Sequence, residues 1–349
     1  MRLIAAAALC AALTPVAAQA DGPSALDHAP IGVMGDHRHG KGEVMVSYRL
    51  MHMDMAGTQI GDEDVDPDRV VTTIPNRFAG MPGQPPTLRI VPTEMRMDMH
   101  MVGIMYGLSD QVTLMAMGSY LTKEMDHVTY QGGMGTTQLG TFRTAPSGFG
   151  DTKIGAMIGL TDTVHATAGI SLPTGSLTEE GEALTPMGMT MPVRLPYPMQ
   201  LGSGTFDLEP ALTYADTTER LGWGAQVKGT IRLGTNDEAY ALGNKAMATA
   251  WLAYAPVHSI SLSARIEAET TGRIDGIDPV IMGPVQTANP DFSGGDRVTA
   301  LAGVNLLGTG NALRGWRLGI EGGVPLYQDL NGPQMPQDWS LTVGVQKAF

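Results

Sequence analysis

Apolar and polar side chains alternate along most of the chain after Glu43. The last segment, QDWSLTVGVQKAF at 337–349, shows the pattern clearly. One face of this segment carries Trp339, Leu341, Val343, Val345 and Phe349, and the other carries Ser340, Thr342, Gly344 and Gln346. Strict alternation is typical of a β-strand with one apolar face. Helical spacing appears nowhere with the same persistence, so the pattern predicts an all-β protein.

The alternation predicts twelve strands, at 43–55, 94–107, 110–124, 150–160, 163–172, 204–214, 220–233, 244–255, 258–269, 296–307, 314–326 and 337–349. Short turns alternate with long links, and the main links are 56–93, 125–149, 173–203 and 270–295. An even number of strands joined in this way is typical of a transmembrane β-barrel. Strands of about ten residues also suit a tilted crossing of the bilayer. We predict a single antiparallel barrel at 43–349, with a secreted β-sandwich as the alternative.

Aromatic side chains support the barrel interpretation, because they are expected where the apolar belt of a barrel meets water. The outward candidates are Tyr48, Tyr106, Tyr120, Tyr214, Tyr254, Trp316 and Trp339. Phe349 ends the last strand on its outward face. A terminal aromatic residue resembles the assembly signal of bacterial outer-membrane proteins, so the barrel assembly machinery is an expected partner.

The N-terminus has the pattern of a secretory signal peptide. Arg2 precedes an apolar run, and Ala18-Gln19-Ala20 forms an A-x-A cleavage site. Residues 1–20 are therefore the predicted signal peptide, and 21–42 form a periplasmic segment that contains His and Met. The single cysteine, Cys10, lies in the signal peptide, which excludes disulfides and thiolate sites from the mature chain.

Charge and motifs exclude several classes of function. The formal net charge is −13. Cleavage of the signal peptide would remove the positive charge of Arg2 and make the chain more acidic. Nucleic acid is not an expected partner of so acidic a chain. The chain has no G-x-S-x-G, H-E-x-x-H or phosphate-binding motif, so we do not expect an enzyme.

Methionine dominates one face of the first strands. In EMRMDMHMVGIMYGL at 94–108, a methionine occupies every second position from Met95 to Met101. Val102, Ile104 and Tyr106 are the expected lipid face, so these methionines are expected to face the barrel interior. The inward set is Met51, Met53, Met55, Met95, Met97, Met99, Met101, Met115, Met117 and Met157. The reverse register, with the methionines facing lipid, is the alternative for this strand.

The inward methionines leave three interpretations open. Thioether side chains are flexible and polarizable, which suits a path for varied hydrophobic solutes. They are also soft ligands that prefer Cu(I) and similar ions. The third interpretation is plain apolar filling. On the outward face of the same strands, His52, Asp54, Asp98 and His100 are expected to mark the end of the apolar belt.

Charged residues are also expected on the inward face. Asp207, Glu209, Arg265, Arg317 and Glu321 are candidates for a charged constriction. Such mixed charges are also common in any water-filled barrel interior. An acidic stretch, GDEDVDPDR at 61–69, lies in a predicted outer loop, where we expect solvent or the divalent ions of lipopolysaccharide as its contacts.

The N-terminal segment carries a candidate metal site. His28, Met34, His37 and His39 include an H-x-H pair and a nearby thioether, a set that suits copper or zinc. A solvated tail is the alternative. If the segment lies inside the barrel, it would act as a plug.

Several blocks of the sequence resemble a bacterial outer-membrane group of transporters similar to the MetA-pathway-of-phenol-degradation family. They include APIGVMGDHRHGKGEVMVSYRLMHMDMAG, GFGDTKIGAMIGL, SLPTGS and QLGSGTFDLEPALTY, and the resemblance covers almost the whole mature chain. It implies a barrel in the outer membrane that moves hydrophobic organic solutes, and it transfers no catalytic residue. We therefore predict passive passage of small hydrophobic or aromatic solutes, with a copper-binding or copper-export protein as the alternative.

Overall fold

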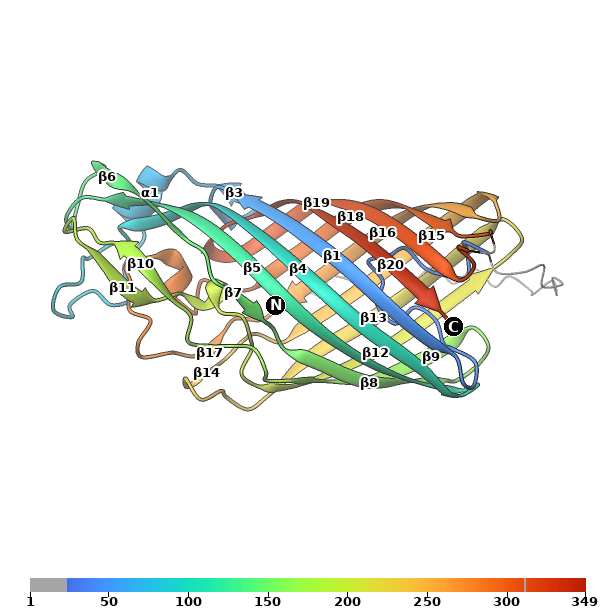
Figure 1. Cartoon of the computed structure of the whole chain (residues 1–349). Helices are drawn as coiled ribbons and strands as arrows, with labels where there is room; N and C mark the ends of the chain where they lie inside the picture. Colours follow the sequence, from blue (N-terminus) through green and yellow to red (C-terminus); the bar gives the residue numbers. More distant parts are fainter. Residues whose placement is uncertain (1–23, 311) are drawn as a thin grey trace.

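The computed structural model describes residues 24–310 and 312–349, so the predicted signal peptide lies outside the described residues. Twelve antiparallel strands form a closed barrel (Figure 1), as predicted. They are β1 (Val44–Ala56), β4 (Ile90–Ser109), β5 (Val112–Tyr130), β8 (Thr152–Gly159), β9 (Val164–Leu172), β12 (Phe206–Thr217), β13 (Leu221–Leu233), β15 (Lys245–Val257), β16 (Ile260–Thr271), β18 (Gly295–Leu307), β19 (Trp316–Gln334) and β20 (Gln337–Ala348). Each strand pairs with the next one, and β20 pairs with β1 to close the ring. Closure gives the wall strands a partner on both sides, which a barrel in lipid requires.

The two ends of the barrel differ. One end, here called the turn end, carries the short connections between strands (right in Figure 1). The other, the loop end, carries the long connections and their small elements. These are β2 (Gln59–Gly61), β3 (Glu63–Asp64), α1 (Pro67–Thr73), β6 (Gln138–Thr144), β7 (Ser147–Phe149), β10 (Glu180–Leu184), β11 (Thr190–Arg194), η1 (Tyr197–Met199), β14 (Tyr240–Ala241), β17 (Asp275–Gly276) and η2 (Gln286–Ala288). Among the described residues, no helix is both long and apolar enough to cross a bilayer.

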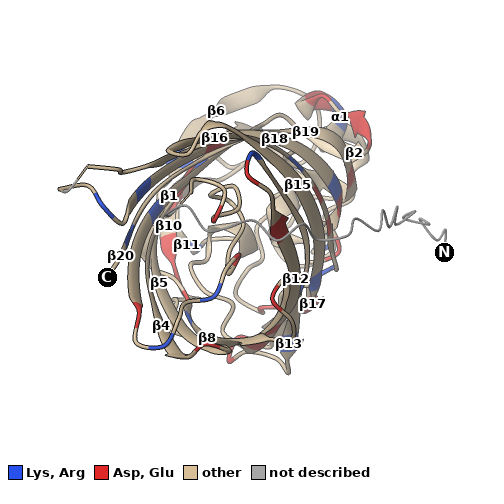
Figure 2. Cartoon of the chain, turned by 90° about the vertical axis from the view of Figure 1, so that its right-hand side faces the viewer, with Lys and Arg blue, Asp and Glu red and all other residues tan. Residues whose placement is uncertain are grey.

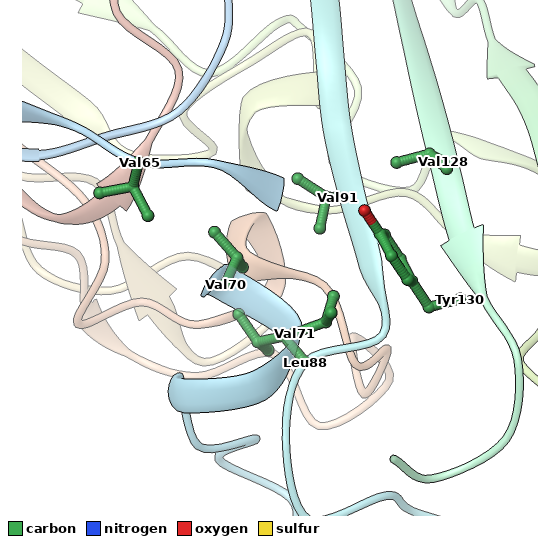
Figure 3. Close-up of a cluster of buried hydrophobic side chains, with 7 residues drawn as sticks. All are labelled: Val65, Val70, Val71, Leu88, Val91, Val128 and Tyr130. Carbon is green, nitrogen blue, oxygen red and sulfur yellow. The ribbon is translucent and has the colours of Figure 1, made fainter. Parts of the chain in front are cut away.

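A small apolar core fixes α1 against the wall at the loop end (Figure 3). Val70 and Val71 of the helix are fully buried against Val91 of β4 and Tyr130 of β5. The Tyr130 hydroxyl also donates a hydrogen bond to Asp68 Oδ1 at 2.8 Å. The first long loop is therefore folded onto the barrel wall.

Three strands extend further into the loop end than the sequence predicted. β4 begins at Ile90, β5 continues to Tyr130 and β19 continues to Gln334. The predicted link at 125–149 was therefore wrong in part, because β5 and β6 pair within it. In these extensions both faces carry polar residues, as Asp126 and His127 of β5 illustrate. The backbone pairing thus continues past the point where the apolar pattern stops.

The outer surface of the barrel is apolar in its middle part. Val102, Ile104 and Leu252 are 58%, 49% and 55% exposed, whereas Met101 is 8% exposed. The exposed apolar side chains form what we call the apolar belt; they include Val46, Leu114, Ile154, Ile158, Leu208, Leu212, Val227, Ile231, Leu262, Ile266, Leu318 and Ile320. The aromatic residues predicted to face outward are exposed as well. A belt of this kind matches the lipid-facing surface of a transmembrane barrel.

Polar pairs lie beyond the belt on β1 and β4. His52 Nδ1 lies 2.7 Å from Asp98 Oδ1, and the Tyr48 hydroxyl lies 2.7 Å from His100 Nδ1. Arg96 lies nearer the loop end and contacts Asp54 at 3.5 Å. The outward face of these strands therefore changes from apolar to polar toward the loop end.

Candidate functional site

The loop end contains a large apolar cavity, here called the loop-end cavity, with a volume of about 930 Å³. It lies between four parts of the chain: the stretch 83–86, the β5–β6 hairpin, the β10–β11 hairpin and the stretch 280–288. His127 and Phe142 form part of its wall with parallel rings whose centroids are 4.5 Å apart. Its apolar lining includes Ile90, Ala183, Met187, Met189, Met191, Val193, Leu195, Ile281, Met282 and Val285. A cavity of this size and character is typical of a site for a small hydrophobic ligand.

Three of the sequence blocks that carry the resemblance, GFGDTKIGAMIGL, SLPTGS and QLGSGTFDLEPALTY, position one wall of this cavity. Asp151, the last residue of G-F-G-D, accepts hydrogen bonds from the backbone N–H of Gly175 at 2.9 Å and of Ser203 at 2.8 Å. Gly175 belongs to SLPTGS, and Ser203 to G-S-G-T-F-D. Asp207 ends G-S-G-T-F-D and accepts hydrogen bonds from Ser203 Oγ and Thr205 Oγ1. The blocks therefore fix both ends of the loop that carries the β10–β11 hairpin.

A cluster of thioethers adjoins the cavity. Leu195 lines the cavity and also packs with the buried residues Met95, Met125 and Met199. Met55 and Met335 pack against the same cluster. An apolar surface therefore continues from the cavity to the inward faces of β1, β4 and β5.

Methionines from neighbouring strands continue this surface toward the turn end. Met55 is paired with Met95, Met53 with Met97, Met51 with Met99 and Met45 with Met105 between β1 and β4. Met105 is also paired with Met115 on β5, and Gly103 with Met117. All of these methionines lie on the face opposite the exposed residues of the belt. We call this surface the methionine wall. Met157 of β8, which is fully buried, packs against Met45 and Met105 at the end of the wall that lies nearer the turn end.

Charged side chains occupy other strands of the interior, and most of them are paired. Asp207 pairs with Arg232, and Glu209 pairs with Lys153 and Lys228. A second network joins Arg265 to Glu321 and Glu267: Arg265 Nε donates to Glu321 Oε1 at 2.9 Å, and Nη1 to Glu267 Oε2 at 2.6 Å. Because each carboxylate has a cationic partner, the interior combines a neutralised polar side with an apolar side. Lys153 was not among the predicted residues, since its partner is 56 positions away along the chain.

The fifth predicted charged residue, Arg317, has a different role. Its guanidinium donates to Asn305 Oδ1 at 2.8 Å and to Gln346 Oε1 at 2.6 Å. It also donates to the carbonyl oxygen of Ala29, in the N-terminal segment. Arg317 therefore holds a piece of the chain inside the barrel.

That piece is the predicted N-terminal segment, whose described part, 24–42, crosses the interior at the turn end (Figure 2); we call it the plug. The Gly32 N–H donates to Glu321 Oε2 of β19 at 3.0 Å. On other strands, Gln226 Nε2 of β13 donates to the Met34 carbonyl at 2.9 Å, and His165 Nε2 of β9 lies 2.8 Å from the Gly35 carbonyl. The plug therefore hydrogen-bonds to widely separated parts of the wall.

Two glycines of the wall make room for the plug. Ile31 is 1% exposed and packs over Gly319 of β19 and Gly344 of β20. A Cβ at Gly319 would lie 2.7 Å from the Ile31 Cβ, and a Cβ at Gly344 would lie 2.9 Å from the Ile31 Cγ1. These distances are shorter than ordinary carbon contacts of about 3.5–4.0 Å. Side chains at these two positions are therefore incompatible with the present position of the plug.

The plug also brings together three of the four predicted metal ligands. His28 and His37 have ring centroids 4.3 Å apart, and His37 and His39 have centroids 4.8 Å apart. Asp36, which the sequence did not single out, lies between the first two. Met34 points elsewhere, with its sulfur against the Arg49 guanidinium. It lines a small cavity of about 30 Å³ with Met45, Met101, Met105, Met115, Met117 and Asp36, here called the methionine chamber.

Comparisons with known proteins bear on the fold. No family model matches the chain, and no curated protein matches it. Among solved structures, the COG4313 outer membrane channel from Pseudomonas putida F1 is 15% identical, with a TM-score of 0.56 over 91% of this chain and 99% of that one. The Ralstonia pickettii toluene transporter TbuX is 11% identical, with a TM-score of 0.47 over 94% and 96% of the two chains. The first match shows a shared fold, and it confirms the prediction of a single β-barrel.

Proposed function

We propose that the protein is a bacterial outer-membrane channel for the passive passage of small hydrophobic solutes, aromatic ones included. The barrel fold shared with an outer-membrane channel and the apolar belt support the location. Barrels of that membrane have short periplasmic turns and long outer loops, so the loop end would face outward and the turn end the periplasm. The observation that carries the proposed solute class is the loop-end cavity.

The cavity is suited to weak capture of such a solute. Burying about 200 Å² of aromatic surface at about 25 cal/mol per Å² contributes about 5 kcal/mol. Association costs of about 4 kcal/mol or more offset most of this gain. Weak binding favours passage, because a tightly held solute would leave the cavity slowly.

The methionine wall supplies the onward route in this proposal. Leu195 joins the cavity to the buried thioethers of Met95 and Met125. Flexible thioether side chains adjust to solutes of different shape. The charged side of the interior is paired internally, so a neutral solute would move along the apolar side without breaking an ion pair. The plug would have to shift before the solute leaves at the turn end.

Two contacts with the cell envelope belong to the same proposal. Phe349 is 72% exposed, and its N–H donates to the Val44 carbonyl at 2.9 Å, where the last strand meets the first. This position suits recognition by the barrel assembly machinery. Asp62 and Asp64 are exposed in the first long loop, where they would meet the divalent ions of lipopolysaccharide.

Solute flux into liposomes tests the proposed function. Mature protein is reconstituted, and the uptake of toluene is compared with that of a sugar of similar size. We expect protein-dependent uptake of toluene alone. The variant Val193→Trp would fill part of the loop-end cavity, so we expect its toluene uptake to fall about tenfold.

A matched variant controls for the added tryptophan. Val227→Trp makes the same change on the apolar belt, where Val227 is 53% exposed, so uptake should match that of the original protein. Protein-dependent sugar uptake equal to that of toluene would contradict the hydrophobic channel. Equal uptake by the Val193→Trp variant would exclude the cavity as the entry site.

A further inference from the structure

Three possible metal-binding side chains of the plug lie close together. One ligand atom from each of His28, Asp36 and His37 lies within 4.8 Å of the other two. His37 Nδ1 is 3.0 Å from Asp36 Oδ1, and His28 Nδ1 is 4.0 Å from Asp36 Oδ2. Ligands on one transition-metal ion, with bonds of about 2.0 Å, lie about 3 Å from each other. Small rotations of two imidazole rings would therefore bring these atoms to coordination distance.

The histidine nitrogens are buried without hydrogen-bond partners. This holds for His28 Nδ1, for both ring nitrogens of His37 and for His39 Nε2. The short distance between His37 and Asp36 lacks hydrogen-bond geometry, so it does not satisfy the His37 ring. Leaving a buried polar atom unsatisfied costs about 1–3 kcal/mol. A single bound cation that accepts the lone pairs of these nitrogens would satisfy several of them at once.

The donor atoms of the cluster suit a transition-metal ion. Two imidazole rings and one carboxylate form a donor set for transition metals.

The surroundings select among cations. Arg49 and Arg317 lie close enough to Asp36 to interact with its charge, and they oppose any additional cation. A hard ion such as Mg²⁺ or Ca²⁺, bound mainly by charge and oxygen ligands, would be repelled. Cu(II) forms the strongest bonds to imidazole among the divalent first-row ions, so it can overcome this repulsion.

We propose that the plug binds one Cu(II) ion through His28, Asp36 and His37, with His39 beside them as a fourth donor. The ion would link the beginning of the plug to its middle, eight to nine residues further along the chain. It would therefore hold the plug in its folded form inside the barrel. This site is separate from the loop-end cavity and does not depend on the solute that the channel passes.

Copper titration of the full-length mature protein in detergent tests this site. Bound Cu(II) is followed by electron paramagnetic resonance, which reports nitrogen ligands through their hyperfine splitting. We expect one Cu(II) per chain with at least two nitrogen ligands. His37→Ala should weaken binding at least tenfold and reduce the nitrogen splitting. Asp36→Asn keeps the shape of the side chain, and it should also weaken binding.

Surface histidines provide the control. His52 and His100 lie on the outer face, so the double variant His52→Ala/His100→Ala should keep the high-affinity ion. Loss of the ion in this variant, or unchanged binding in both His37→Ala and Asp36→Asn, would overturn the proposal. Protease resistance of the plug in the copper-free variants distinguishes the loss of a ligand from misfolding of the plug. A variant that loses copper while its plug stays protected supports direct coordination.

Discussion

The substitution Gly319→Val tests the packing of the plug residue Ile31 against the barrel wall. The new Cβ would lie 2.7 Å from the Ile31 Cβ and 3.0 Å from its Cγ1. Because β19 is held on both sides by β18 and β20, the plug has to move rather than the wall. Moving it would expose Ile31, at a cost of about 1.5–3 kcal/mol, and would break the Gly32–Glu321 hydrogen bond, worth about 1.5–3 kcal/mol.

The plug in its folded position should therefore be destabilised by about 3–6 kcal/mol relative to a displaced plug. Since about 1.4 kcal/mol is a factor of ten, the fraction of molecules with a displaced plug should rise at least a hundredfold. Limited proteolysis within 24–42 and single-channel conductance in planar bilayers measure this change. The control is Gly322→Val on the same strand, because a Cβ at Gly322 meets only the Ser340 carbonyl, at 3.9 Å. Equal cleavage and conductance for the two variants, both folded as barrels, would refute the reasoning.

Three further substitutions test other parts of the structure. Val102→Arg places a charge on the apolar belt, and it should cost about 2–4 kcal/mol when unfolding by urea is measured in lipid vesicles. Asp207→Asn leaves the Arg232 charge unpaired, so the free energy of unfolding should fall by about 3–5 kcal/mol in the same assay. Asp151→Ala removes the acceptor for the N–H groups of Gly175 and Ser203, and faster proteolysis at 173–205 with an unchanged barrel is the expected result. Unchanged values in these assays would count against the belt, the ion pair and the loop anchor, respectively.

The sequence predicted the barrel because a strand between lipid and the barrel interior has to alternate in polarity. The same constraint predicted the inward direction of the methionines, since Val102 and Ile104 had to meet lipid. The alternation of apolar and polar residues is required only where a strand contacts lipid. The extensions of β5 and β19 lie beyond the lipid, so the sequence pattern did not predict them. There the faces of a strand no longer differ in environment, and only backbone pairing maintains the strand.

The sites depend on contacts that local patterns do not show. Asp36 is an ordinary loop residue in the sequence, and only the fold of the plug places it between His28 and His37. The loop-end cavity combines segments from 83 to 288, each of which resembles a plain Gly- and Pro-rich link. Lys153 becomes a partner of Glu209 because β8 and β12 both flank β9. Such sites require the tertiary structure.

The location of a bound aromatic molecule tests the central claim most directly. Crystals of the protein soaked in bromobenzene would reveal the bromine by its anomalous scattering. We predict a peak in the loop-end cavity between Phe142 and Val285, with weaker peaks along the methionine wall. Bromine found only against the outer apolar belt, with none inside the barrel or its loops, would contradict the account.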